Sequence, residues 1–119
     1  MEPKEFNFEF PRGDTCPIKF NVTSKQTGEG IDLSTLDEIY FTVKKNYSVS
    51  EALFQKKKSL GEIQIDGSNA TVILEHDDTK LMKYGDYVYD VQIKTGTYVK
   101  TILIGTFTLT NEATHYANE

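Results

Sequence analysis

The sequence lacks most of the features that mark membrane proteins, nucleic-acid-binding proteins and disulfide-stabilised proteins. It has one cysteine, Cys16, so no disulfide can form within the chain and the fold must depend on packing. Its longest apolar run, residues 101 to 105, is too short to span a bilayer. Its formal charge of −5 disfavours binding to nucleic acid or anionic lipid. We therefore expect neither nucleic acid nor a membrane as a partner.

Sequence motifs for catalysis are also missing. No glycine-rich phosphate loop, serine-centred elbow or zinc-ligand spacing occurs. Cys16 stands beside Pro17 at the start of an expected strand, without the local signature of a nucleophile. Asp86 and Asp90 would lie ~13 Å apart along an extended strand, farther than glycoside hydrolysis requires. We predict a protein that is not an enzyme and that has no catalytic residue and no cofactor.

Two short motifs have structural explanations. Arg12-Gly13-Asp14 spells an integrin-binding tripeptide, but its place between two expected strands is typical of a tight turn, with Asp14 capping the turn and Arg12 facing solvent. Residues 75 to 78 place four possible metal ligands in a row. Consecutive strand residues point in opposite directions, and the segment lacks the pattern of a Ca²⁺ loop. We predict a solvated acidic turn and no metal site.

Strand-forming residues dominate what is present. All aromatic residues are Phe and Tyr, seven of each, and both types favour strands. The clearest strand pattern lies in residues 83 to 94. There Tyr87, Tyr89, Val91 and Ile93 alternate with Val88, Asp90, Gln92 and Lys94, which predicts a central strand with one face on the core. An inward Leu81, a flexible Gly85 and then Tyr87 are typical of a tyrosine corner, in which the tyrosine hydroxyl bonds upstream backbone.

Similar alternation predicts the other strands. They cover residues 6–10, which end at Pro11 and form an edge strand, then 18–22, 39–43 and 98–110, and a hairpin of 62–66 with 70–75 around the turn at 67–69. In the last strand Val99, Thr101, Leu103, Phe107 and Leu109 should share one face, and Gly105 marks a bulge or a close backbone approach.

The connecting segments are less regular. Residues 24–29 close a hairpin or begin a longer crossing, and residues 31–37 form a half-turn that tucks Leu33 and Leu36 under the core. Residues 46–59 contain either a helical turn at 49–53 or a loop that leads into a short strand near Phe54. The run of lysines at 56–58 should be a solvated strand end. The tail, residues 111–119, should be mobile.

About 7–8 short strands without sustained helical periodicity predict one all-β domain over residues 1–119. The expected fold is an antiparallel, immunoglobulin-like β-sandwich, and a partly open barrel is the alternative.

Four segments carry a resemblance to a known family: residues 12–15 with 18–22, residues 31–34, residues 39–44, and residues 81–91. They resemble small tail or baseplate-associated proteins of phages and prophages from Gram-positive bacteria, and above all the N-terminal domain of the phage baseplate upper protein family. The resemblance covers about residues 8 to 112. In that family the domain is a β-sandwich that fastens a longer receptor-binding or scaffold assembly to the tail. If the chain is complete, an adaptor, decoration or completion protein is implied.

The resemblance implies other phage structural proteins as partners and a homo-oligomer in the assembled particle. Because the N-terminus is charged and no signal-like run follows it, we expect synthesis in the bacterial cytoplasm and then a place in the virion. Candidate interface residues are the aromatic side chains of the edge strand, which would pair with a neighbour, and three tyrosines at strand surfaces. They are Phe6, Phe8, Phe10, Tyr40, Tyr47 and Tyr98. The alternative function is a carbohydrate-binding module that uses exposed tyrosines and the acidic turn at Asp77-Asp78.

Overall fold

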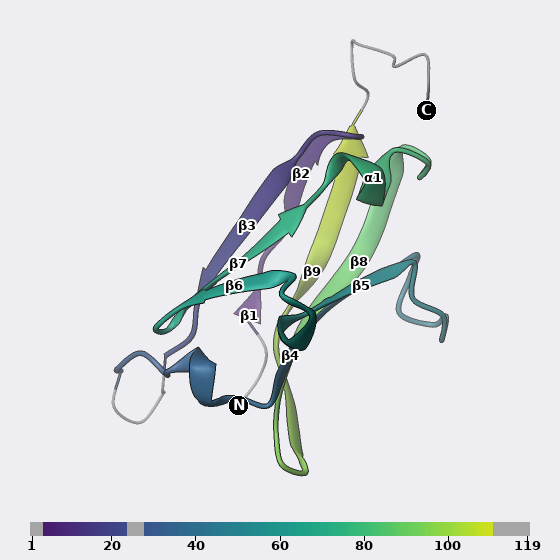
Figure 1. The fold of residues 1–119 in the computed structure, drawn as a ribbon. Helices are drawn as coiled ribbons and strands as arrows, with labels where there is room; N and C mark the ends of the chain where they lie inside the picture. The colour runs from purple at the N-terminus through teal and green to yellow at the C-terminus, as the bar shows by residue number, and fades with distance from the viewer. Residues whose placement is uncertain (1–3, 24–27, 111–119) are drawn as a thin grey trace.

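Two stacked β-sheets make up the domain in the computed structural model, which describes residues 4–23 and 28–110 (Figure 1). The larger sheet has the strand order β1-β9-β8-β4-β5, with β2 also paired to β9, and the smaller sheet has the order β3-β7-β6. The strands are β1 (Lys4–Glu5), β2 (Phe8–Pro11), β3 (Cys16–Asn21), β4 (Glu38–Lys44), β5 (Phe54–Lys57), β6 (Ile63–Asp66), β7 (Asn69–Leu74), β8 (Gly85–Thr95) and β9 (Tyr98–Thr110). The all-β sandwich is confirmed.

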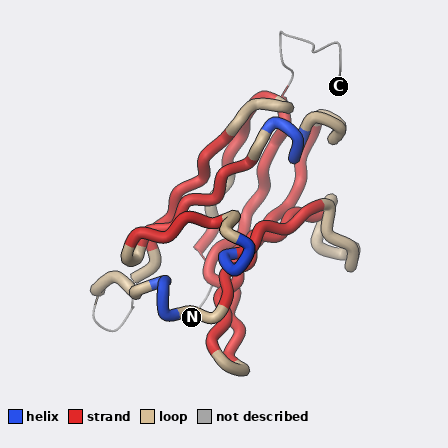
Figure 2. Tube along the Cα trace, viewed as in Figure 1, coloured by secondary structure: helices blue, strands red, loops and turns tan. Residues whose placement is uncertain are grey.

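The helices are short and occupy connections between strands (Figure 2). They are η1 (Leu33–Thr35), η2 (Lys58–Leu60) and α1 (His76–Thr79). A bilayer-crossing helix needs about 20 apolar residues, and no helix among the described residues is long and apolar enough to cross a membrane.

The strand order is that of an immunoglobulin-like sandwich. The order β9-β8-β4-β5 corresponds to strands G-F-C-C′, and β3-β7-β6 corresponds to B-E-D. The expectation of purely antiparallel sheets is wrong at one edge, because β1 and β2 both run parallel to β9. This pairing follows from the chain path: the N-terminal segment enters beside β9 and crosses at its end to the other sheet as β3 (Figure 1).

The core lies between the sheets and takes one side of each strand. In β8 the predicted inward residues Tyr87, Tyr89, Val91 and Ile93 are all buried. The facing layer comes mainly from β3 and β7, through Ile18, Val72 and Leu74 among others. Alternation in the sequence therefore predicted the core face of the central strand correctly.

The connections settle the alternatives that the sequence leaves open. Gly67 and Ser68 join β6 to β7 as a two-residue turn, close to the predicted hairpin. A loop rather than a helical turn leads into β5 at Phe54, and Leu33 is fully buried in η1, as expected for the half-turn. The expected mobile tail at 111–119, and residues 24–27 of the expected 24–29 connection, lie outside the described residues.

A bulge in the β8–β9 hairpin changes which side chains of β9 face the core. The register shifts between Val91 and Gln92, which pair with Leu103 and Thr101, so Ile102 is the extra residue. One extra residue reverses the alternation, and Val99 is therefore 53% exposed instead of facing inward. The prediction that Val99 and Thr101 share the face of Leu103 is wrong for this reason, since Thr101 pairs with the outward Gln92.

Candidate protein-interaction surfaces

The N-terminal edge of the larger sheet is formed by β1 and β2, which pair with β9 in one continuous register. The N–H groups of Phe6 and Arg12 donate to Ile104 O (2.9 Å) and Thr110 O (3.0 Å). Since backbone groups of alternate strand residues point to opposite sides, the N–H of Glu9 points away from β9. Pro11, which has no N–H, shares this orientation. Among the described strands β2 has no partner on this side, so the predicted edge strand is confirmed.

Asn7 interrupts the edge between β1 and β2. Its side-chain oxygen accepts hydrogen bonds from the N–H of Thr106 (2.8 Å) and from its hydroxyl (3.2 Å). The carbonyl of Phe6 accepts instead from the hydroxyl of Tyr89. A Cβ at Gly105 would collide with this Phe6 carbonyl oxygen. The predicted close backbone approach at Gly105 is confirmed, and it fixes the edge segment to the middle of β9.

Two of the three predicted interface phenylalanines pack inside the domain. Phe10 is 7% exposed, and Phe8 and Phe10 both stack on Phe107, at centroid distances of 5.6 and 6.0 Å. Phe6 extends this row toward solvent and is 51% exposed. The structure does not agree with the expectation that all three side chains fill a neighbour's pockets, because Phe8 and Phe10 point inward and complete the core of this chain. Phe6 alone keeps a largely open surface.

The tyrosine corner is present at the start of β8. The Tyr87 hydroxyl donates to Lys83 O at 2.7 Å, four residues upstream. Gly85 has a φ of 133°, which L side chains rarely adopt, so the glycine is needed there. Leu81 is 79% exposed, and its expected inward orientation is wrong. The motif was correct in its tyrosine and glycine, whereas Leu81 lies on the surface before the corner.

The Arg12-Gly13-Asp14 turn docks on the segment around α1. Gly13 N donates to Thr79 Oγ1 at 2.9 Å, and Arg12 Nη1 donates to Met82 O at 3.2 Å. The guanidinium also lies 4.4 Å from the centre of the Tyr84 ring. The predicted tight turn is confirmed, but Arg12 is engaged with the corner rather than directed into solvent.

The acidic turn is a structural cap. Glu75 and Asp78 form a capping box on α1, in which the Asp78 carboxylate accepts from Glu75 N at 2.7 Å. Asp78 also pairs with Lys56 Nζ at 2.8 Å, with side-chain exposures of 17% and 11%. Lys56 therefore points inward, and the prediction that it is solvated is wrong. Within residues 4–23 and 28–110 no cluster of three or more metal-ligating side chains occurs.

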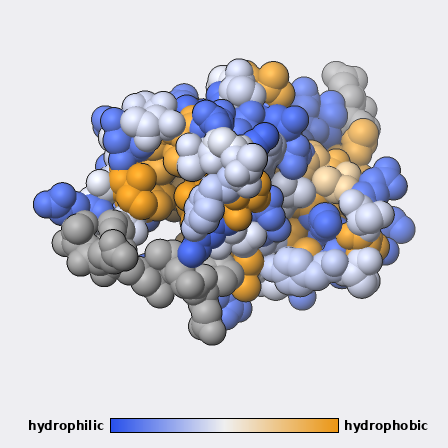
Figure 3. All heavy atoms as spheres, turned by 90° about the horizontal axis from the view of Figure 1, so that it is seen from below, coloured by the Kyte–Doolittle hydropathy of each residue, from blue (hydrophilic) through white to orange (hydrophobic). Residues whose placement is uncertain are grey.

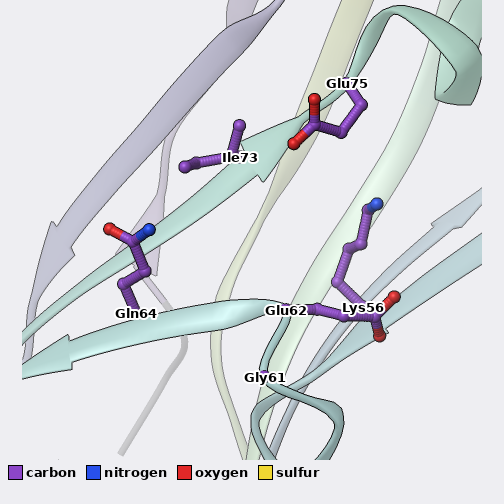
Figure 4. A pocket seen from close by; sticks show the side chains of 6 residues that line it. All are labelled: Lys56, Gly61, Glu62, Gln64, Ile73 and Glu75. Carbon is purple, nitrogen blue, oxygen red and sulfur yellow. The ribbon is translucent and has the colours of Figure 1, made fainter.

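A pocket of about 310 Å³ opens between β5, β6 and β7, and its lining is mostly charged or polar (Figure 4). The lining residues are Lys56, Gly61, Glu62, Gln64, Ile73 and Glu75. Lys56 is paired with Asp78, the Glu62 carboxylate accepts from Lys57 N at 3.0 Å, and Glu75 caps α1. These three charged side chains around the pocket are thus already engaged in contacts within the domain.

The face of the larger sheet that points away from β3, β7 and β6, called the outer face below, carries two of the predicted tyrosines. Tyr40 is half-buried beside Lys57, whose Nζ lies 5.8 Å from the ring centre. The Tyr47 hydroxyl donates to Tyr89 O (3.3 Å) and Gly105 O (3.2 Å), while the residue is 57% exposed. The hydroxyl is thus fixed above the β8–β9 seam, and much of the ring remains open to solvent.

Asp90 lies at the centre of the outer face. Burial raises the pKa of its carboxyl, and Lys44 partly opposes this shift. Burial raises the pKa of the Tyr47 phenol, and the charges of Asp90 and Glu5 raise it further. The hydrogen bond to Gly105 lowers this pKa but does not cancel the increase. The strand register agrees with these charge effects, because Glu5 and Asp90 both pair with Ile104, next to Gly105, whose carbonyl accepts from the Tyr47 hydroxyl.

Tyr98 lies at the far end of the β8–β9 hairpin and is 55% exposed. Gly96 N at the tip donates to Asp37 Oδ2 at 2.5 Å, and Asp37 N donates to Lys94 O at 2.9 Å, so the tip is braced. Seen from this end, apolar residues form separate patches between hydrophilic ones (Figure 3). Tyr98 pairs with Thr95 near the tip, whereas Tyr40 pairs with Gln92 and the Tyr47 hydroxyl bonds Gly105 O, so Tyr98 stands apart from the other two tyrosines.

The remaining candidate groups do not converge on a reactive centre. Burial, and then the charge of Asp14, raises the pKa of the Cys16 thiol, which opposes thiolate formation. Tyr40 faces outward from the larger sheet, whereas Asp78 meets the inward side chain of Lys56. Tyr40 and Tyr47 on one side, and Asp78 of the acidic turn on the other, therefore lie on opposite faces of that sheet, although the carbohydrate-binding alternative joins them in one site.

Comparison with known proteins leaves the family open. No protein-family model and no curated protein matches the chain. Among solved structures, a family 123 glycoside hydrolase from Clostridium perfringens, studied for glycolipid glycan hydrolysis, is similar at 13% identity and a TM-score of 0.42. The match covers 92% of this chain and 23% of that chain, and so carries no argument about activity.

Proposed function

We propose that this chain is a non-enzymatic structural or adaptor protein of a phage or prophage particle, in a baseplate, tail or neck assembly. It acts through protein–protein contacts, and the free backbone edge of β1 and β2 accepts a strand from a neighbouring particle protein. The sequence resemblance to baseplate-associated proteins supports the setting. The observation that carries the mechanism is the difference between this edge and the other sheet edges.

The other edges carry features that discourage strand addition. The edge strand β3 contains Pro17, and β5 directs the charged Lys56 inward. The remaining edge strand, β6, has four residues, whereas β1 and β2 together follow β9 in one register from residue 4 to residue 11. The β1/β2 edge has a proline only at its last position, Pro11, and carries the exposed Phe6 between its two strands. An incoming strand would meet unpaired backbone groups of Glu9 and an apolar side chain at Phe6.

Mass spectrometry of purified particles induced from the host strain tests the setting. We expect the chain to be present in a fixed ratio to the major capsid protein, with a low ratio for a connector or baseplate ring. Absence from intact particles would overturn the phage role.

A single substitution tests the edge. Glu9→Pro removes an N–H that points away from β9, at the same orientation as the natural Pro11, so the domain should stay folded. Glu9→Ala is the matched control, since it removes the same side chain and keeps the N–H. We expect the proline variant alone to be missing from particles. Removing residues 1–10 is a poorer test because it takes Phe10 out of the core. Incorporation of both variants at the wild-type level would contradict strand addition at this edge.

A further inference from the structure

Acidic side chains of the outer face stand in two rows that begin at the N-terminal edge. Each row crosses β9 and has a carboxylate at both of its ends. The rows are Glu5–Ile104–Asp90 and Glu9–Thr108–Asp86. Four residues separate the rows, so they lie about 13 Å apart along the strands. The edge therefore presents two acidic positions, Glu5 and Glu9, at a spacing that the sheet fixes.

The two edge carboxylates have no basic neighbour that neutralises them. Both glutamates are exposed, and among residues 4–23 and 28–110 neither takes part in an ion pair. Lys44, whose charge acts on Asp90, lies on β4, three strands from β1 and thus about 14 Å away. The negative charge of Glu5 and Glu9 is therefore free to act on a strand that arrives beside them.

The opposite side of the same edge is apolar in its middle. Phe6 is 51% exposed and Phe8 is half-buried. Residues that lie opposite each other in paired strands share one face of the sheet. An added strand would therefore place two side chains against Phe6 and Phe8, and the two flanking side chains beside the glutamates. The charged residue on the apolar side is Lys4, which stands at the start of β1.

A second copy of this chain fits the edge poorly. Two copies related by a two-fold axis pair antiparallel, and the registers that pair most of residues 4–11 are centred on Asn7 or on Phe8. Centred on Asn7, Glu5 of each copy lies opposite Glu9 of the other, and like charges in this position destabilise a sheet. Centred on Phe8, the two Glu9 side chains are diagonal neighbours about 7–8 Å apart. The charges therefore favour a different protein over a second copy.

We infer that this edge selects a basic strand of another protein, with Lys or Arg across from Glu5 and Glu9 and apolar side chains across from Phe6 and Phe8. The inference rests on the proposed function, because it names the chemistry of the strand that the same edge accepts. The pattern is symmetric about the position opposite Asn7, so it holds for a parallel or an antiparallel partner. Two cross-strand pairs of opposite charge favour a basic over a neutral strand by about 5-fold.

Peptide binding to the purified full-length chain tests this preference by fluorescence anisotropy. The probes are labelled nine-residue peptides with the core Lys-Val-Thr-Val-Lys, or with both lysines replaced by threonine or by glutamate. We expect the dissociation constant of the lysine peptide to be about 5-fold below that of the threonine peptide and about 25-fold below that of the glutamate peptide. Glu5→Lys/Glu9→Lys should reverse this order.

A matched control separates the edge from the overall charge. Glu51→Lys/Asp66→Lys makes the same change in net charge at exposed positions of the β4–β5 connection and of β6, and should keep the wild-type order. The inference is overturned if this control also reverses the order. It is equally overturned if the lysine peptide binds no tighter than the threonine peptide, which includes the absence of binding by every peptide.

Particle content distinguishes this inference from the proposed function. We expect Glu5→Lys/Glu9→Lys to be missing from particles, like Glu9→Pro, and Glu51→Lys/Asp66→Lys to be present. If only Glu9→Pro is missing, the edge accepts a strand without regard to charge, and this inference alone fails. If Glu9→Pro is incorporated, both proposals fail. A wild-type dimer in sedimentation velocity that Glu9→Pro abolishes and Glu9→Ala keeps would make a second copy the occupant and overturn the inference.

Discussion

Gly105→Ala should disturb the N-terminal edge through one methyl group. The new Cβ would collide with the Phe6 carbonyl oxygen, so the segment between β1 and β2 must move. Forced overpacking costs about 1–3 kcal/mol. Losing the Tyr89–Phe6 hydrogen bond adds about 1 kcal/mol, so we expect a total of about 2–4 kcal/mol in the free energy of unfolding. Urea denaturation measures this loss, and Tm should fall by about 10 °C.

A double-mutant cycle separates the steric effect from the hydrogen bond. Tyr89→Phe removes the hydroxyl that donates to Phe6 O and should cost about 1 kcal/mol in the wild type. In the Gly105→Ala background that bond is already broken, so the second substitution should cost little. If Gly105→Ala stays within about 0.5 kcal/mol of the wild type, the close approach does not exist and the reasoning fails.

Three further substitutions test other parts of the fold. Tyr87→Phe removes the bond to Lys83 O and should cost about 1 kcal/mol by urea denaturation, and an unchanged midpoint would contradict the tyrosine corner. Lys56→Met leaves Asp78 without its ion pair and should lower the free energy of unfolding by about 2 kcal/mol, a value between those of exposed and fully buried pairs. The double variant Lys56→Met/Asp78→Asn should recover part of this loss, because no unpaired carboxylate remains. Asp90→Asn should stabilise the monomer at neutral pH. Because burial raises the folded-state pKa of Asp90 above 3.8, the unfolded state ionises first as pH rises. The advantage of the Asp90→Asn variant over the wild type should therefore vanish below about pH 3.8 in denaturation series, and an advantage that persists there would contradict this cause.

Local rules explain what was predictable from the sequence. Period-two alternation identifies the inward residues of β8 because a single strand fixes the direction of each side chain. The hairpin at Gly67 and Ser68 and the tyrosine corner at Tyr87 also depend on residues within a few positions of each other. Gly105 was informative because a glycine inside a strand indicates either a bulge or a close neighbour.

Long-range placement explains what was missed. In the sequence, Lys56 is one of three consecutive lysines and looks like a surface residue. Its inward orientation depends on α1, which brings Asp78 within 2.8 Å of its Nζ. Val99 follows the alternation of β9 in the sequence, and only the pairing with β8 reveals the extra residue Ile102. Phe8 and Phe10 have the pattern of any edge strand, and their use in the core depends on parallel pairing with β9 next to Phe107.

The N-terminal edge can accept a neighbouring strand without disturbing the core, because the two contacts use perpendicular directions. Backbone groups of Glu9 point away from β9 in the plane of the sheet, whereas Phe8 and Phe10 on either side stack on Phe107 in the core. Glu9→Pro should therefore remove the chain from particles while its urea midpoint stays close to that of Glu9→Ala. A proline variant that is less stable than the alanine control by more than about 1 kcal/mol would show that this N–H is used within the domain.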